Sequence, residues 1–158
     1  MNHKENAEIV KSYLDKNEMH YMTEEREDMT VFTGQLGMKK SVFNAVQFSL
    51  YAEEKVVQIF VNPPVMAAEK IAEMVEFAAR VNFSLKRGKL DVDCADGEVR
   101  FHLCVPVAAV RADPDDTLCD LLLIPLLVLM KYGKGITEIL FADADAKTAY
   151  GHCENCEV

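Results

Sequence analysis

Apolar positions along the chain follow two periods, one typical of helices and one typical of strands. Residues 7–16 carry apolar side chains four positions apart, as in the pairs Ile9 with Tyr13 and Val10 with Leu14. Residues 66–81 show the same period, with an apolar face opposite a charged one. The pattern therefore predicts a helix over each of these two ranges.

Strand patterns occupy the chain between and after these helices. The β-branched and aromatic content predicts strands over residues 19–24, 29–38, 42–51 and 55–61. Proline has no backbone N–H for a sheet ladder, so Pro63 and Pro64 end the fourth strand.

A hairpin is predicted over residues 90–105, where Asp96-Gly97 supplies a turn between two alternating segments. The alternation places one set of side chains in the core, namely Val99, Phe101, Leu103 and Val105. It places Arg100 and His102 on the opposite face.

The last third of the chain is predicted to be helical. Asp113 before Pro114 fits an N-cap followed by the first helical position, and Gly133 fits a helix end near Lys131. Pro125 inside this segment predicts a kink or two shorter helices. Residues 136–141 could continue as helix, and Asp143 or Asp145 could cap a final helix that runs through Tyr150.

The order of these elements predicts an α+β fold with a largely antiparallel sheet and helices packed on one face. The 158 residues, half of them hydrophobic, suit one domain that spans residues 1–158. We expect its last residues to form a short flexible tail.

The net charge and the lengths of the apolar segments limit the kinds of partner that the chain can bind. The formal charge of −9 disfavours nucleic acid and anionic membranes, and the basic group at residues 80–89 is too small to reverse this. The apolar run of residues 121–130 is too short to cross a bilayer. Residues 1–8 are polar and unlike a secretion signal, so we expect a cytoplasmic protein without nucleic-acid or membrane partners.

One region of the sequence resembles a known family. Residues 79–85 read Ala-Arg-Val-Asn-Phe-Ser-Leu, residues 86–90 read Lys-Arg-Gly-Lys-Leu, and the Asp96-Gly97 turn precedes Val99-Arg100-Phe101. This combination is similar to the YbjN family of bacterial proteins, described as putative sensory transduction regulators. The resemblance spans roughly residues 7–154 and is most specific over residues 68–107.

The resemblance implies a fold like that of type III secretion chaperones, which are usually dimers that hold extended segments of other proteins. It supplies no catalytic, metal or cofactor residues. The leucine-rich run around Pro125 and the cysteine-rich end depart from the family pattern.

The most suggestive chemical motif is the sequence His152-Cys153-Glu154-Asn155-Cys156. A C-x-x-C pair can bind zinc or act as a redox couple. A tetrahedral zinc site needs four ligands, however, and no second ligand pair is present. We therefore expect a frayed tail with free thiols and no bound metal or cofactor. A site shared between two chains is the alternative.

Other candidates have simpler explanations. His102 and Cys104 share a strand face and could form a nucleophilic pair, but no acidic group that would orient the histidine is evident. The acidic cluster of residues 113–120 lacks the spacing of a calcium loop, and helix capping accounts for most of it. No glycine-rich phosphate loop is present. We expect no catalytic residues.

The five cysteines are expected to be reduced, because their number is odd and no export signal is evident. Three of them lie in apolar segments and are expected in the core, namely Cys94, Cys104 and Cys119.

The sequence thus predicts a non-enzymatic module that binds an unidentified protein partner or acts in regulation. The alternative is a metal-binding or redox protein that uses the terminal C-x-x-C. We also expect a homodimer, because residues 118–130 are apolar nearly all round and one face of this helix must meet water or another surface. Leu122 and Leu126 are the residues that we expect at the dimer interface.

Overall fold

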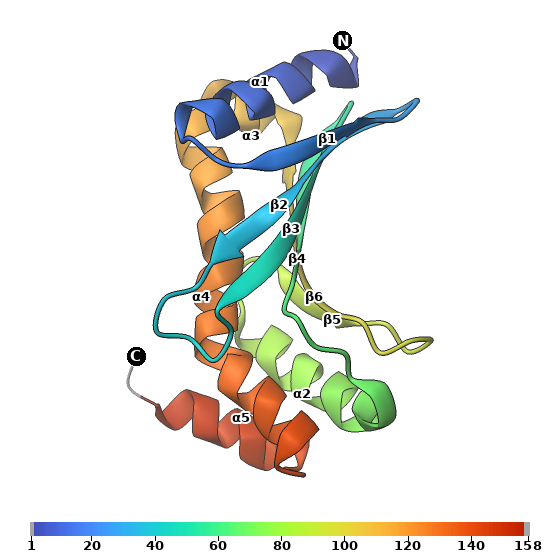
Figure 1. The fold of residues 1–158 in the computed structure, drawn as a ribbon, viewed down its shortest axis with the longest axis vertical. Helices are drawn as coiled ribbons and strands as arrows, with labels where there is room; N and C mark the ends of the chain where they lie inside the picture. Colours follow the sequence, from blue (N-terminus) through green and yellow to red (C-terminus); the bar gives the residue numbers. More distant parts are fainter. Residues whose placement is uncertain (1, 157–158) are drawn as a thin grey trace.

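A single sheet of six strands forms one layer of the molecule, beside the long helix α4 (Pro114–Phe141) (Figure 1). The computed structural model describes residues 2–156. The strands are β1 (Tyr21–Glu25), β2 (Met29–Gly37), β3 (Ala45–Glu53), β4 (Val56–Asn62), β5 (Lys89–Val92) and β6 (Val99–Pro106). Their order in the sheet is β1-β2-β3-β4-β6-β5, and every neighbouring pair is antiparallel. This confirms the predicted α+β fold class.

Helices cover one face of the sheet and one of its ends. They are α1 (His3–Lys16), the short 3-10 helix η1 (Ala68–Lys70), α2 (Ile71–Ser84), α3 (Val107–Ala112), α4 (Pro114–Phe141) and α5 (Ala146–Asn155). Helices α1 and α4 lie against the central strands, whereas α2 packs on β5 and on α5 (Figure 1). The helix predicted over residues 66–81 therefore begins later, after Met66 has formed a β-bridge with Glu98.

The alternation of strand β6 confirms the predicted register. The side chains of Val99, Phe101, Leu103 and Val105 are buried, and Arg100 and His102 are more exposed. Strands β3 and β4 show the same alternation, with Phe48, Leu50 and Ile59 fully buried. Since a strand alternates its faces with a period of two residues, the buried sets of neighbouring strands meet on the side covered by α1 and α4.

Helix α4 corrects the prediction for the last third of the chain. It is one helix of 28 residues with Pro125 inside it, not two shorter helices, and it passes through Gly133 to end at Phe141. Asp113 caps its start as predicted, since its side chain accepts a hydrogen bond from the backbone N–H of Asp116. Among residues 2–156, no helix is long and apolar enough to cross a membrane.

The two glycines of α4 explain why the helix does not stop at Gly133. A Cβ at Gly133 would lie 2.9 Å from the ring of Phe43, and one at Gly135 would lie 2.6 Å from the ring of Phe77. Both glycines therefore allow neighbouring rings to pack directly on the helix backbone, and tertiary packing outweighs their low helix propensity.

Candidate functional site

The sheet has a second face, here called the outer face, that α1 and α4 do not cover. Strand alternation and register place on it Tyr51 of β3, Gln58 and Phe60 of β4, and Arg100, His102 and Cys104 of β6. These side chains are only partly buried, or exposed in the case of Cys104. The outer face is therefore a regular surface of the fold that neither helix covers.

Aromatic and cationic groups cluster at the centre of the outer face. The Phe60 ring stacks on the His102 ring with centroids 4.5 Å apart and planes inclined by 14°. The Arg100 guanidinium carbon lies 4.3 Å from the centroid of Phe60, and the Tyr51 ring meets Phe60 edge-on at 5.4 Å. Stacking and cation–π contacts of this kind hold side chains in fixed orientations on a surface.

Hydrogen bonds fix the His102 ring within this cluster. Gln58 donates from Nε2 to Glu53, so its Oε1 accepts a hydrogen bond from His102 Nε2 at 2.8 Å. Partial burial lowers the pKa of His102 more than the nearby Asp91 carboxylate, 3.9 Å away, raises it. His102 is therefore neutral at pH 7 and donates from Nε2.

The arrangement of Cys104 does not match a Cys–His nucleophile. Both ring nitrogens of His102 face other groups, since Nε2 bonds Gln58 and Nδ1 faces Asp91. Burial and the Glu53 carboxylate raise the pKa of the Cys104 thiol. A catalytic cysteine needs a lowered thiol pKa, so the geometry gives this pair no activation.

A hollow of about 450 Å³ continues the outer face at one end of the sheet. Three amide side chains from adjacent strands contribute to its wall, namely Gln35, Gln47 and Asn62. The rest of the wall comes from the loop between β2 and β3, from the first two residues of β3, and from Pro63 and Pro64. Amides beside apolar side chains can hydrogen-bond a peptide backbone while they shield it from water.

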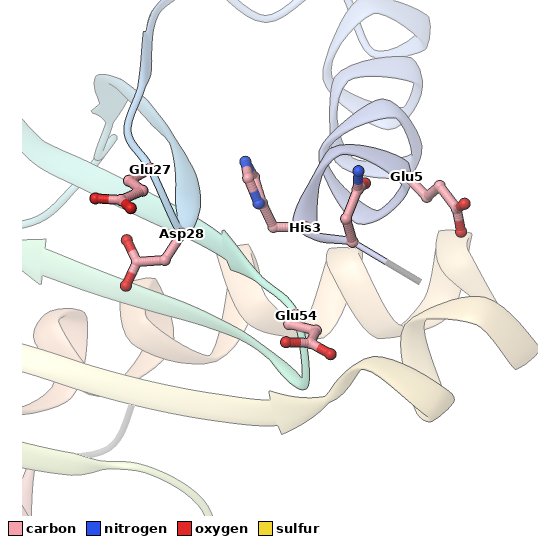
Figure 2. Close-up of a pocket in the computed structure, with 6 residues that line it drawn as sticks. His3, Glu5, Glu27, Asp28 and Glu54 are labelled. Atoms are coloured by element: carbon pink, nitrogen blue, oxygen red, sulfur yellow. The ribbon is translucent and has the colours of Figure 1, made fainter.

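An acidic pocket of about 850 Å³ lies at the opposite end of the sheet, beside the start of α1 (Figure 2). Carboxylates from α1 and from two strand turns line it, namely those of Glu5, Glu27, Asp28 and Glu54. Asn2 and His3 complete the wall, and the buried Nε2 of His3 has no hydrogen-bond partner among residues 2–156. All four acidic residues are exposed, as is usual for charged residues at turns, so the cluster alone indicates no ligand.

The C-terminal cysteines do not lie in a frayed tail, which corrects the prediction. Helix α5 continues to Asn155, and Cys153 is 1% exposed, with its sulfur beside Gly135 of α4. Cys156 is exposed at the helix end, and the His152 ring contacts Glu138 at 2.8 Å. Cys153, Cys156 and His152, the three candidate metal ligands, thus lie in three different environments. Burial also raises the pKa of the Cys153 thiol.

The remaining cysteines also differ from the prediction. Cys94, Cys104 and Cys119 are exposed rather than buried in the core. The acidic cluster at the start of α4 matches the capping interpretation, because Asp113 caps the helix while Asp115 and Asp120 pair with Lys16 and Arg87. Within the described part of the chain, no three His, Cys, Asp or Glu side chains are placed to share a metal ion.

The sequence did not identify the cluster around Phe60, because its members come from three strands. By strand alternation, Tyr51 and Phe60 lie on the outward face of β3 and β4. An aromatic residue at an outward position is the sequence signal that could have indicated the site. Comparisons with protein-family models, with curated proteins and with solved structures found no match. The resemblance to the YbjN family therefore stays a prediction.

Proposed function

We propose that the chain is a non-enzymatic protein-binding or regulatory module, as the YbjN resemblance implies, whose protein partner binds across the outer face of the sheet. The observation that carries this proposal is the partly exposed cluster of Tyr51, Phe60 and Arg100 on an uncovered sheet face. Tyrosine and arginine are enriched among the residues that contribute most to protein interfaces.

The shape of the surface supports a protein rather than a small molecule as partner. The cluster stands on a sheet face, and the adjoining hollow is lined by amide side chains that suit a peptide backbone. A partner segment that crosses the cluster and ends in the hollow would bury aromatic, cationic and amide groups together. Because the stack and the Gln58–His102 bond already hold these side chains, binding would cost little side-chain entropy.

The same contacts support binding rather than catalysis. His102 is neutral and hydrogen-bonded to Gln58, and the raised pKa of Cys104 disfavours its thiolate. The alternative of a metal or redox protein that uses Cys153 and Cys156 gains no support from the geometry, since Cys153 is buried against α4 and Cys156 is exposed.

The proposal is tested by measuring partner affinity in outer-face variants. Proteins captured from the native cell by the tagged chain are identified by mass spectrometry, purified and titrated by calorimetry. We expect Tyr51→Ala and Arg100→Ala each to weaken binding about tenfold or more, as for central interface residues. Phe83→Ala is the matched control, because Phe83 is 96% exposed but lies on α2. Unchanged affinity in both outer-face variants would contradict the proposal.

A further inference from the structure

Helix α4 carries an exposed apolar row on the side that faces away from the sheet. Leu123, Leu127 and Met130 are 46%, 53% and 40% exposed, whereas the apolar residues on the opposite side of this helix are buried. Their spacing of four and then three residues places them along one line of the helix surface. A row with this spacing is typical of a helix that packs along a second helix.

Charged residues extend this row in both directions and differ in sign. Asp116 and Asp120 precede the apolar residues, and Lys134 follows them at the same alternating spacing. We name the whole line, from Asp116 through Leu123, Leu127 and Met130 to Lys134, the α4 seam. The seam is therefore negative at its start, apolar at its centre and positive at its end.

Contacts within the chain already neutralise part of this charge. Asp120 pairs with Arg87 at 2.5 Å, and Lys131, beside the seam, pairs with Glu154 at 2.9 Å. Lys134 makes a longer contact of 3.6 Å with Glu138, one turn further along the same helix. Asp116 and Lys134 are thus the end charges that a partner helix would meet.

We propose that a second copy of the chain covers the α4 seam, with the two α4 helices antiparallel. The positions of the seam residues set the register, because Leu123 and Leu127 are equally distant from Pro125, and so are Asp116 and Lys134. A two-fold axis near Pro125 therefore places Leu123 against the partner's Leu127 and Asp116 against the partner's Lys134. It also places Met130 beside the partner's Asp120, and Asp120 is a carboxylate that Arg87 of its own chain already pairs. Each contact occurs twice in such a symmetric interface.

The charges select the antiparallel direction. In a parallel pair, Asp116 would face the partner's Asp116 and Lys134 would face the partner's Lys134, so both ends would repel. The antiparallel pair instead joins opposite charges at both ends. This interface differs from the expected one by one residue on each side, because Leu122 is buried and Leu126 is partly buried in the monomer, whereas Leu123 and Leu127 are exposed.

The dimer is independent of the proposed function, since the seam and the outer face lie on opposite sides of the two-layer fold. A dimer formed through α4 leaves both outer faces open for partner proteins. Loss of the dimer in a variant and loss of partner binding in another are therefore separate outcomes.

Sedimentation equilibrium of the full chain tests the dimer first. We expect twice the 17.8 kDa monomer mass at tens of micromolar concentration. Leu127→Glu should weaken the dimer about tenfold or more, because it places a charge at the centre of the interface. Met22→Glu is the matched control, since Met22 is 75% exposed on β1. A monomer at 100 micromolar (roughly the upper end of this range), or a dimer unchanged by Leu127→Glu, would overturn the proposal.

Charge reversal tests the register and the direction. Asp116→Lys and Lys134→Asp should each weaken the dimer about fivefold, because each creates two like-charge pairs. The double variant should recover affinity to within about threefold, since its opposite charges face each other again. Asp115→Lys controls for the loss of an acidic residue in the first helical turn. Circular dichroism checks that each variant is folded, and failure of the double variant to recover would overturn the antiparallel register.

Discussion

At the scale of single residues, Cys153 and Cys156 show how one motif can divide between two environments. They are three positions apart on α5, but the Cys153 sulfur lies in the core beside Gly135 while Cys156 is exposed at the helix end. The Cys153 thiol is also within 3.9 Å of the backbone oxygen of Tyr132. Cys153 is therefore a packing residue that joins α5 to α4.

This placement leads to a prediction for the two serine variants. Cys153→Ser should lower the free energy of unfolding by about 1–3 kcal/mol, because it buries a hydroxyl where a weakly polar sulfur was packed. Cys156→Ser, the matched control, should change it by less than about 0.5 kcal/mol. Urea denaturation followed by circular dichroism measures both. Equal stability of the two variants would contradict the burial of Cys153.

Single residues also show what the sequence could predict about burial. The core set on β6 followed from alternation, because a strand with one buried face fixes the environment of every second residue. For Cys104 two expectations disagreed, because its apolar segment indicated the core whereas the alternation of the strand placed it with His102 on the outward face. The structure has it exposed on the outward face. The position of Cys104 in the alternation of the strand, and not the polarity of the neighbouring residues, determined on which face it lies.

At the scale of elements, helix α4 shows the contribution of tertiary packing. Its start was predictable, since an Asp113 cap is a local interaction. Its end was not predictable, because the helix continues through Gly133 and Gly135. These glycines pack against the rings of Phe43 and Phe77, which lie far away in the sequence. Local helix propensity therefore placed the end of this helix too early.

The glycine contacts predict opposite effects for two similar substitutions. Gly135→Ala should destabilise the fold by about 1–3 kcal/mol, because its Cβ would lie 2.6 Å from the Phe77 ring and 2.8 Å from the Cys153 sulfur. Gly151→Ala in α5 has open space around its Cβ and should stabilise the fold by up to about 1 kcal/mol. Thermal and urea unfolding test both, and a stabilising Gly135→Ala would refute the close packing.

At the scale of the whole molecule, the candidate site depends on pairings between distant segments. Phe60 and His102 lie opposite each other because β6 pairs with β4, although α2 and β5 separate these strands along the chain. The sequence predicted the strands and their outward positions but not which strands are neighbours in the sheet. The cluster on the outer face therefore became visible only with the topology.

The buried Asn6 side chain hydrogen-bonds the N-terminal helix to the rest of the molecule. Its Nδ2 donates to the backbone oxygen of Glu53 at 2.6 Å and to that of Glu54 at 3.1 Å. Its Oδ1 accepts a hydrogen bond from Arg111 Nη2 at 2.7 Å. Asn6 thus connects α1 to the turn between β3 and β4 and to α3, which precedes α4.

Removal of these hydrogen bonds should lower the stability of the whole fold. Asn6→Ala removes the donor from two partly buried backbone carbonyl groups and leaves Arg111 without this acceptor, so we expect a loss of about 2–4 kcal/mol in the free energy of unfolding. Asn17→Ala makes the same change at the exposed end of α1 and should cost less than about 1 kcal/mol. Because α1 packs on β2, β3 and α4, far-ultraviolet circular dichroism and tyrosine fluorescence should report one shared unfolding transition for Asn6→Ala. An early transition confined to α1, with the sheet still folded, would show that the helix is not part of the cooperative core.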